Sequence, residues 1–352
     1  MASELPTVRW GIVATGLISS WFASDIIRDR PNKQASHIIQ AVGSSSLEKG
    51  KAFVEKHIPG TTPSVYGSYE EVYADPNVDV VSIGTPHAFH KQNCLDAIKH
   101  GKNVLCEKAF TLNAAEAKEV FAAAKEKGVF IMEAMWTRFY PLIKELQRLI
   151  HAEKVVGDVH RVFCDFALAQ NIASLPADSR LKNPALGAGT LLDIGIYSLT
   201  YGLITLDGGV GDAAENPKIA AQQHLVDGVD VATSIILLYP GAKQGILTCS
   251  SFLRGGREFC RIEGTKGTIV VEGIAASAPS SFTVNIEGQD PKKYEFEKPG
   301  FGFYFEADAV AADIAAGRKE NATMPWAETV RVLEMLDEVR RQGGAIFPQE
   351  KN

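Results

Sequence analysis

Residues 7–20 read TVRWGIVATGLISS, in which a short apolar run is followed by a turn of small residues and the start of a helical pattern. The apolar run predicts a buried strand from Val8 to Ala14, and the pattern after it predicts a helix from about Leu17. Such a turn directs its backbone N–H groups and a helix N-terminus to one place, an arrangement that binds the phosphates of a dinucleotide. A full Gly-x-Gly-x-x-Gly fingerprint would have glycine where Ala14 and Ser19 stand. Taken alone, the stretch is therefore also compatible with a plain strand-to-helix turn.

Short apolar runs and helical patterns continue to alternate up to about residue 130. We expect further strands at 38–43, 78–84, 103–107 and 129–132, and helices that begin near residues 47, 90 and 114. Strands that alternate with helices at this spacing are joined by right-handed parallel crossovers. The pattern therefore predicts an α/β domain with a doubly wound parallel sheet over residues 1–135. Because the turn at 7–20 begins this series, we interpret it as a dinucleotide-binding turn.

After about residue 135 the pattern changes to runs with strand-like alternation. A helix is expected at 142–151, a strand at 159–169 and a loop rich in Pro, Ala and Gly at 172–190. Six further strand-like runs lie at 232–239, 245–252, 258–263, 268–272, 282–286 and 293–296. They predict a second domain over residues 136–352, of α+β class, with a large open and mostly antiparallel sheet. Two helices expected at 304–317 and 327–342 could pack back on the first domain.

The composition is that of an ordinary globular protein. With 352 residues, 45% hydrophobic and 22% charged, the chain is long enough for two domains with sizeable cores. A net charge of -6 without a block of like charges argues against nucleic acid as a partner. Five scattered cysteines without a Cys-x-x-Cys pair are typical of reduced thiols. Since the sequence has no leader-like start and no long apolar run, we expect a cytoplasmic protein with no membrane segment.

The end of the second predicted strand bears on cofactor choice. An NAD-selective site usually places an acidic side chain there, to bind the 2'-hydroxyl of the ribose. Here Ser44, Ser45 and Ser46 follow the strand, with Lys49 and Lys51 nearby. Three hydroxyls and two ammonium groups could accept a 2'-phosphate, which favours NADP over NAD. The serines could equally cap the next helix, and the two roles are compatible.

Residues 85–90, TPHAFH, follow the third strand of the expected parallel sheet, at the edge where such sheets bind ligands. We therefore expect Thr85 and Pro86 to contact the cofactor. His87 and His90 could suggest a metal, but a zinc site needs further ligands and the sequence has no matching Cys or His cluster. No metal is expected, and His90 is interpreted as a helix-start or ribose-contacting residue rather than a catalyst.

Lysine, aspartate and tyrosine at two distant places suggest acid/base chemistry. Lys108 follows the strand at 103–107, and residues 191–197 read LLDIGIY, with Asp193 and Tyr197 four residues apart. On a helix these two side chains would stand on one face. An ammonium near a phenol favours the phenolate, and a carboxylate keeps that ammonium charged, so the trio could take a proton from an alcohol. The alternative is a solvated lysine and a helix-capping acid beside a buried phenol.

Several motifs together resemble one known family. They are ATGLI at 14–18, EK at 107–108, MEAMWTRFYP at 132–141, LLDIGIY at 191–197, GTKG at 264–267 and FPQ at 347–349. Over nearly its whole length the chain resembles the Gfo/Idh/MocA oxidoreductases, and within them the dimeric dihydrodiol dehydrogenases and fungal D-xylose dehydrogenases. The resemblance implies an N-terminal Rossmann domain, a C-terminal domain whose open sheet often forms a homodimer, and NADP as cofactor.

The resemblance also implies roles for individual residues. Tyr197 stands where many relatives have histidine, and in the dihydrodiol type this tyrosine is the acid/base, with the matched Lys108 and Asp193 beside it. Trp136 and Arg138 lie on a stretch that lines the substrate cleft or the dimer contact, although Trp136 could simply pack between domains. Substrate contacts are thus expected from Trp136, Arg138 and Tyr197. Cofactor contacts are expected from Ala14, Thr15, Gly16, Leu17, Ile18, Ser44, Ser45, Ser46, Thr85, Pro86, His90, Glu107, Lys108 and Arg180, the last near the nicotinamide.

The chain departs from the family pattern at Ala109. Relatives commonly have Glu-Lys-Pro with a cis peptide before the proline, whereas here Ala109 follows Lys108. A cis bond before a residue other than proline is costly, so this bond is expected to be trans or to be held cis by its surroundings. The fungal xylose dehydrogenases resemble this chain in having alanine, so the role of Lys108 stays in place.

The motifs lead to one main hypothesis for function. We expect an NADP-dependent dehydrogenase acting on the CH–OH group of a sugar or diol, such as D-xylose or a trans-dihydrodiol, and working as a homodimer. A carbonyl reductase of the same family, acting on a dicarbonyl or an anhydro-ketose, is the alternative among enzymes. A dinucleotide-sensing regulator of the galactose-repressor type is the alternative outside them. A sensor has no use for a Lys–Asp–Tyr relay, so the presence of all three residues favours an enzyme.

Overall fold

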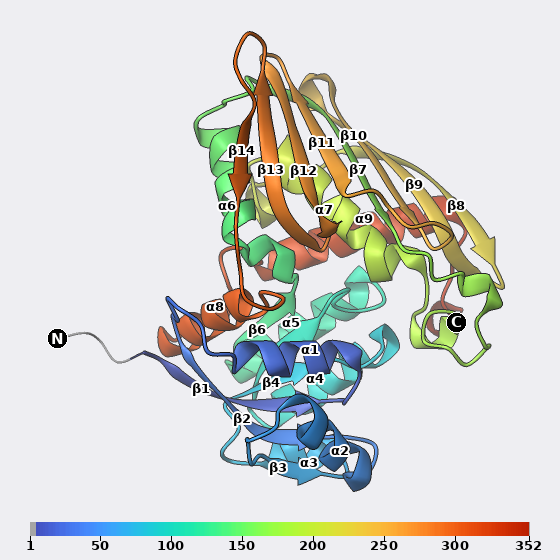
Figure 1. Cartoon of the computed structure of the whole chain (residues 1–352). Coiled ribbons are helices and arrows are strands. Elements are labelled where there is room, and N and C mark those ends of the chain that lie inside the picture. The colour runs from blue at the N-terminus through green and yellow to red at the C-terminus, as the bar shows by residue number, and fades with distance from the viewer. Residues whose placement is uncertain (1–4, 352) are drawn as a thin grey trace. The chain divides into compact units, whose positions relative to one another are not determined.

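The computed structural model of the chain describes residues 5–351 (Figure 1). Its contacts divide the chain into two compact units. The first unit comprises the chain up to Thr111, Ala115–Trp136 and Lys298–Thr329; the second comprises Leu112–Ala114, Thr137–Glu297 and the chain from Val330 onward. Whereas the sequence suggests one boundary at 135/136, the segment that contains helix α8 (Tyr304–Ala315) is thus part of the first unit.

A six-stranded parallel sheet forms the centre of the first unit, in the order β3-β2-β1-β4-β5-β6. The strands are β1 Thr7–Val13, β2 Ser36–Gly43, β3 Ser64–Tyr66, β4 Val80–Ile83, β5 Asn103–Glu107 and β6 Ile131–Ala134. From β1 the chain proceeds first toward one edge and then toward the other, so the order reverses between β1 and β4. Ligands bind such sheets outside the carboxyl ends of the strands at this point. The doubly wound sheet predicted from the sequence is confirmed.

Five helices connect these strands: α1 Leu17–Ile26, α2 Leu47–His57, α3 Tyr69–Ala74, α4 His90–Lys99 and α5 Ala114–Lys127. The sequence prediction missed β3 and α3. Both are short, with three and six residues, and too brief for a periodic pattern to appear. The start of α3 is nevertheless marked by Ser68, whose hydroxyl accepts the N–H of Glu71 at 3.4 Å.

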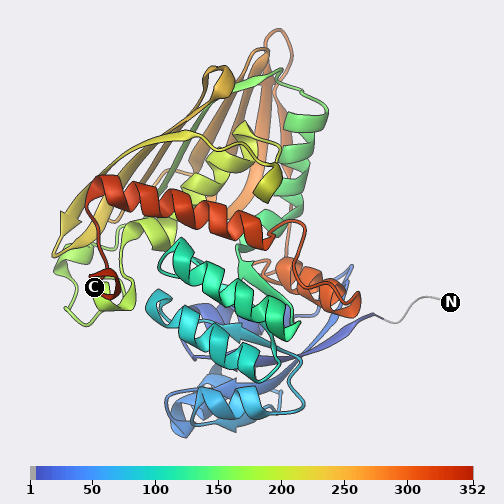
Figure 2. The same ribbon diagram turned by 180° about the vertical axis from the view of Figure 1, so that it is seen from behind.

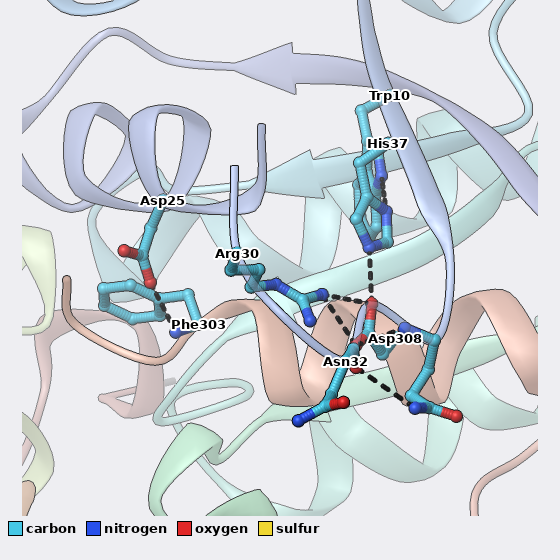
Figure 3. A network of polar contacts seen from close by, with 8 residues as sticks. Trp10, Asp25, Arg30, Asn32, His37, Phe303 and Asp308 are labelled. Atoms are coloured by element: carbon cyan, nitrogen blue, oxygen red, sulfur yellow. Dashed lines mark hydrogen bonds and ion pairs between the residues drawn. The ribbon is translucent and has the colours of Figure 1, made fainter. Parts of the chain in front are cut away.

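A buried polar network joins α8 to the first strands of its own unit (Figure 3). Asp308 accepts two hydrogen bonds of 2.7 Å from Nη2 of Arg30 and lies 2.9 Å from Nε2 of His37 on β2. The indole N–H of Trp10 on β1 donates to Nδ1 of His37 at 3.1 Å. Because an indole nitrogen only donates, Nδ1 must accept and the ring proton sits on Nε2, facing Asp308. Trp10 thereby selects the tautomer that α8 requires.

Asp25 on α1 holds the loop that precedes α8 (Figure 3). Its fully buried carboxylate accepts the backbone N–H groups of Phe301, Gly302 and Phe303 at 3.0, 2.7 and 2.9 Å. A carboxylate that accepts several N–H groups gains strong, charge-assisted hydrogen bonds. Gly300 has a φ of 65°, and a Cβ there would lie 1.9 Å from the Asp25 carboxylate, so only glycine fits. These contacts explain why a segment 276 to 278 residues away in sequence belongs to the first unit.

An eight-stranded sheet forms the second unit, in the order β14-β13-β12-β11-β7-β10-β9-β8. The strands are β7 Val159–Ala167, β8 Lys218–Val226, β9 Val229–Tyr239, β10 Lys243–Ser250, β11 Glu258–Gly264, β12 Gly267–Ala275, β13 Ala278–Ile286 and β14 Lys292–Glu295. All neighbours are antiparallel except β7 and β10. The mostly antiparallel sheet predicted from the sequence is confirmed. The sequence prediction missed β8, an edge strand whose side chains are mostly exposed or half-buried.

Helices lie on one face of this sheet, as Figure 2 shows for α7 (Ile196–Leu206) and α9 (Trp326–Gly343). A π-helical turn, Leu191–Gly195, leads directly into α7, and α6 (Pro141–Gln147) ends in a second π-helical turn at Arg148–Ala152. Every residue of α7 is buried. A Cβ at Gly202 would lie 2.9 Å from Leu247 of β10, so glycine lets α7 approach the sheet closely. Pro184–Leu206 is long and apolar enough to cross a membrane, but its most apolar window is 94% buried, as is typical of a core helix.

The opposite face of the sheet carries side chains that alternate with the buried ones. On β9, Ile236 and Leu238 point away from the helices and are 44% and 42% exposed. Phe163 on β7 and Ile246 on β10 are half-buried on neighbouring strands. No helix among residues 5–351 covers these side chains. The face is therefore an open, partly apolar surface.

Candidate active site

The turn between β1 and α1 has the backbone geometry expected of a phosphate-binding turn. Ala14 has a φ of 77°, a left-handed conformation that glycine adopts at lower cost, and its N–H donates to Gly43 of β2 at 3.1 Å. Gly16 is the N-cap of α1, and a Cβ added there would meet no atom within 4 Å. A Cβ at Gly84 would lie 2.4 Å from the hydroxyl of Ser19, so glycine lets α1 pack against the end of β4. The first turn of α1 has no acidic residue and no side-chain cap at its N-terminus, which fits a pyrophosphate.

The three serines after β2 differ in their surroundings. Ser44 is buried, and its hydroxyl lies 2.9 Å from that of Thr15 in the phosphate turn. Ser46 caps α2 by accepting the N–H of Lys49 at 3.3 Å. Ser45 is exposed and accepts a hydrogen bond from the ammonium of Lys49 at 3.2 Å. Capping, one of the two roles expected for the serines, belongs to Ser46, whereas Ser45 and Lys49 present a hydroxyl and a positive charge to solvent.

His90 joins the ends of two strands. Its ring is fully buried, with Nε2 2.8 Å from the carbonyl oxygen of Thr85 and Nδ1 3.0 Å from that of Ala109. Burial lowers the pKa of His90, and the nearby charge of Lys108 acts in the same direction. A neutral ring can donate only one of these hydrogen bonds. His90 is the first residue of α4, as one of its expected roles required, but with both nitrogens directed at backbone oxygens the geometry does not favour the other role, contact with a ribose.

Lys108 follows β5 at the carboxyl edge of the sheet and is half-buried. The Lys108–Ala109 peptide bond, expected from the sequence to be either trans or held cis by its surroundings, is cis. The next residue, Phe110, donates its N–H to the Glu133 carboxylate at 3.2 Å. Behind this edge, Glu306 of α8 is fully buried; burial raises its pKa, and the charge of Glu107 adds to the effect. The backbone that follows Lys108, at Ala109 and Phe110, is thus held by hydrogen bonds to His90 and Glu133.

The second half of the expected catalytic group lies in the second unit. Asp193 is in the π-helical turn and Tyr197 is the second residue of α7. Tyr197 is 4% exposed, and its ring meets that of Phe166 edge-on, with the centroids 5.6 Å apart. Nη1 of Arg180 lies 3.5 Å from the Asp193 carboxylate, so these two expected site residues form an ion pair. Because Lys108 belongs to the first unit, its approach to Asp193 and Tyr197 stays a prediction.

Two residues of this half-site were not identified from the sequence. Phe166 is one, because an aromatic residue in a strand usually signals only core packing. Asp230 is the other: it is buried on β9 and accepts the N–H of Leu191 at 2.7 Å. An acid inside an apolar run was a usable signal, but the predicted strand began at residue 232, and the observed β9 begins at Val229.

The residues expected to contact substrate are less accessible than the sequence suggested. Trp136 is 6% exposed and stacks on Phe303 of the same unit, with the centroids 4.1 Å apart. This contact favours a packing role for Trp136. Arg138 is 3% exposed in the second unit. Its neighbour Thr137 donates its hydroxyl hydrogen to the carbonyl oxygen of Ser277 at 2.7 Å, which holds this stretch against the β12–β13 hairpin.

No grouping of three or more His, Cys, Asp or Glu side chains that could hold a metal ion occurs within residues 5–351. His87 and His90 are near each other, with ring centroids 5.6 Å apart, but His90 is engaged by carbonyl oxygens. All five cysteines are free and buried.

Comparison with protein families matches both units. Residues 8–135 match the oxidoreductase family with an NAD-binding Rossmann fold, and residues 143–270 match the GFO/IDH/MocA C-terminal domain. The chain belongs to the Gfo/Idh/MocA oxidoreductase family. It is therefore an enzyme, an oxidoreductase with a Rossmann domain for a nicotinamide dinucleotide, and the resemblance noted from its motifs is confirmed.

Two kinds of relative are similar to this Gfo/Idh/MocA protein over nearly its whole length. A D-xylose 1-dehydrogenase (NADP(+)) from Hypocrea jecorina is 37% identical, over 99% of this chain and 95% of the relative. A trans-1,2-dihydrobenzene-1,2-diol dehydrogenase from Sus scrofa is 36% identical, over 98% of this chain and 99% of the relative. Both are named dehydrogenases, and the two names are those that the motifs suggested.

Solved structures share the fold at low sequence identity. A levoglucosan dehydrogenase in complex with NADH and levoglucosan has a TM-score of 0.81 at 17% identity, over 96% of this chain and 97% of that one. The aldose-aldose oxidoreductase from Caulobacter crescentus has a TM-score of 0.79 at 22% identity, over 96% of this chain and 98% of that one. At these identities the similarity establishes the arrangement of strands and helices expected for this family.

Proposed function

We propose that this protein is an NADP-dependent dehydrogenase that oxidises a CH–OH group of an aldose or a cyclic diol. The observation that carries the proposal is the helical segment of the second unit, which presents Asp193 and, four residues later, the buried phenol of Tyr197. The relative named D-xylose 1-dehydrogenase (NADP(+)), 37% identical, supports both the reaction class and the cofactor.

In the proposed reaction Tyr197, as phenolate, accepts the proton of the substrate hydroxyl. The electron pair of the adjacent C–H bond leaves as hydride, so that the carbinol carbon becomes a carbonyl; an aldose oxidised at its ring C1 gives a lactone. Bound NADP supplies the hydride acceptor, at C4 of its nicotinamide. The proton remains on Tyr197 until it is lost to solvent, and the reverse sequence reduces a carbonyl.

Lys108 and Asp193 have supporting roles in this proposal. The ammonium of Lys108 stabilises the phenolate and the developing alkoxide, a task that is most effective where water is excluded. Asp193, paired with Arg180, orients positive charge toward the reacting groups. Tyr197 is suited to the central role because its ring is buried and packs edge-on against Phe166.

The choice of NADP over NAD is proposed from the residues after β2. Ser45 and Lys49 are exposed, hydrogen bonded to each other, and lie just beyond the carboxyl end of the strand next to β1. A 2'-phosphate there would gain charge-assisted hydrogen bonds from both residues. A ribose 2'-hydroxyl would gain much less, because the carboxylate that usually binds it is missing at this place.

The experiment that tests the function follows absorbance at 340 nm with NADP or NAD and a panel of aldoses, dihydrodiols and cyclitols. A substrate turned over with NADP by the wild type, and at least a hundredfold more slowly by Tyr197→Phe, is expected, because a general base typically contributes 10²- to 10⁴-fold. NADPH binding, followed by fluorescence, should be unchanged in the variant. Equal turnover by the two proteins would rule out Tyr197 as the acid/base.

A homodimer is part of the proposal. The open face of the second sheet carries Ile236, Leu238, Phe163 and Ile246, an apolar group that a second copy of this chain could cover. Light scattering at micromolar concentration should give twice the chain mass of 38.1 kDa. Ile236→Lys should shift the particle toward the monomer mass, and a wild-type monomer would contradict the proposal.

A further inference from the structure

Asp230 of β9, a buried residue, meets three consecutive residues just before the Asp193–Tyr197 segment, two of them through its carboxylate and one through its backbone oxygen. The N–H of Leu191 donates to its Oδ2 at 2.7 Å, and the hydroxyl of Thr190 donates to its backbone oxygen at 2.9 Å. Gly189 approaches so closely that a Cβ there would lie 2.2 Å from Oδ1 of Asp230, at a φ of 136° that side-chain-bearing residues rarely adopt. Residues 189–191 are thus fitted to Asp230.

The same three residues also set the position of the helical segment that carries Asp193 and Tyr197. Leu191 is the first residue of the π-helical turn, and Asp193 is two residues further along. The N–H of Asp193 lies 3.3 Å from the carbonyl oxygen of Gly189, so Asp193 is tied to the stretch that Asp230 holds. Tyr197 follows on the continuous helix, where Gly195 packs on Cys249 of β10. A shift at Leu191 would therefore be transmitted to both site residues.

The surroundings of Asp230 contain little to neutralise its charge. Its side chain accepts one further hydrogen bond, from Thr233 at 3.2 Å. The ionisable groups that act on it from neighbouring elements are Arg340 of α9 and the thiol of Cys249 on β10. Arg340 is already bound at 2.7 Å by each of two other carboxylates, Asp337 and Glu350. Burial accordingly raises the pKa of Asp230 to about 6, while the N–H of Leu191 opposes the shift.

We propose that Asp230 is a positioning residue of the active site: its ionised carboxylate holds the N–H of Leu191 and thereby fixes Asp193 and Tyr197 relative to the sheet. The inference rests on the proposed function, since it assigns a purpose to the placement of those two residues. It adds a residue that touches neither substrate nor cofactor and a link between turnover and pH. When Asp230 takes up a proton, a neutral hydrogen bond of roughly half the strength replaces the charge-assisted one.

The test compares kcat and KM from pH 5 to pH 9 in the wild type, Asp230→Asn and the control Asp165→Asn. The carboxamide of Asp230→Asn keeps an oxygen acceptor for Leu191 but no charge. Asp165 lies on β7, on the face away from the helices, where it accepts the hydroxyl hydrogen of Thr248. We expect an inflection near pH 6 in the kcat of the wild type and of the control, and its absence in Asp230→Asn.

Above pH 7 we expect kcat of Asp230→Asn to be about tenfold below that of the wild type, with KM nearly unchanged, and the two proteins to converge at pH 5. A decrease of equal size at every pH would mean that Asp230 is only structural and would overturn the inference. So would a pH profile identical to that of the wild type.

A second measurement does not depend on turnover. Amide hydrogen exchange in the wild type should be faster for Leu191 and Asp193 at pH 5.5 than at pH 7.5, after correction for the intrinsic pH effect. This difference should vanish in Asp230→Asn. If Tyr197→Phe is fully active but exchange behaves as described, the proposed acid/base role fails while the hold of Asp230 on the segment stands. If the exchange of the Leu191 and Asp193 amides in the wild type were the same at both pH values, the proposed role of Asp230 would be wrong.

Discussion

The predicted phosphate turn of the first unit, around Ala14 and Gly16, and the segment Leu191–Tyr197 of the second unit are positioned by different means. Ala14, Gly16 and Gly84 act through backbone conformation and close packing, and their partners are the strands and the helix that the turn itself connects or neighbours. Leu191 and Asp193 depend instead on Asp230, a carboxylate 39 residues away from Leu191 on another strand. The turn is thus built by local geometry, whereas we propose that a distant buried charge holds the acid/base group.

The difference has a physical cause. Backbone N–H groups at a helix N-terminus are oriented by the helix, so a phosphate site needs only room and the absence of competing acids. A side-chain acid/base group must be held in one rotamer and at one height above the sheet, which takes packing and hydrogen bonds from other elements. The second kind of site is therefore more sensitive to single changes at a distance.

The largest expected effect is on turnover. Lys108→Met should lower kcat by roughly 10²- to 10⁴-fold, because the phenolate of Tyr197 and the developing alkoxide lose the positive charge that the proposal assigns to them. NADPH binding measured by fluorescence should change little. Lys49→Met serves as the control, since it removes a lysine of the same unit that the proposal assigns to cofactor choice alone. Comparable kcat values for Lys108→Met and the wild type would show that Lys108 of the first unit does not act together with Tyr197 of the second.

The next largest effect is on the stability of the first unit. Asp25→Ala leaves the buried N–H groups of Gly302 and Phe303, and the part-buried one of Phe301, without their acceptor. At about 1–3 kcal/mol for each buried unsatisfied group, the free energy of unfolding should fall by at least about 2 kcal/mol. Urea denaturation followed by the fluorescence of Trp10 and Trp21 measures it. Asp29→Ala, at an exposed position paired with Lys33, should have no measurable effect.

A smaller effect concerns the pH dependence of stability in the second unit. The pKa of Asp230 in the folded protein is about 6, raised from an ordinary value of 3.8 by burial, so the folded state holds the proton more tightly than the unfolded state. Its contribution is fully present below about pH 4 and is lost as the pH rises through about 6. Relative to Asp230→Asn, the wild type should lose about 3 kcal/mol between pH 4 and pH 7.

Urea titrations of the two proteins at pH 4, 5, 6 and 7 would give this difference. A gap that stays constant, or that changes in the opposite direction, would show that burial does not control Asp230. The expected sign also separates stability from activity, because the ionised form that is proposed to hold Leu191 for turnover is the less stable one.

The smallest effect is on cofactor choice. Lys49→Ala should raise KM for NADP about tenfold, the loss of one charge-assisted contact to a 2'-phosphate, and leave KM for NAD unchanged. Initial rates with each dinucleotide measure it. An equal change for both dinucleotides would assign Lys49 to general electrostatic attraction and would remove the proposed 2'-phosphate contact.

The sequence predicted the architecture well where patterns were long. Strand β5 has the predicted bounds, and helices α1, α2, α4 and α5 begin where predicted, since their periodicity is local. It failed for β3, α3 and β8, which are short or lie at an edge with few buried side chains. It placed the 298–329 segment in the second domain while allowing the terminal helices to pack back on the first, because nothing in that segment reveals that Asp25 and Arg30 will bind it.

For the site, the sequence indicated residue types and the structure assigned their surroundings. It singled out Ser44, Ser45 and Ser46 together, but only the fold gave burial to the first, exposure to the second and capping to the third. It gave His90 a helix-start or ribose-contacting role; His90 does begin α4, and only the fold showed that its ring lies between the carbonyl oxygens of Thr85 and Ala109. Side-chain partners more than a few residues away leave no trace in a periodic pattern.

By itself the sequence determined the family, the parallel and antiparallel sheets, the phosphate turn and the candidate trio of Lys108, Asp193 and Tyr197. These follow from hydrophobic periodicity, turn chemistry and local motifs, which act over a few residues. Only the tertiary structure placed Asp230 under Leu191 and joined Asp308 to His37. The reason is that a buried charge is tolerated only where distant groups enclose and hydrogen bond it, and the chain must fold before they do so.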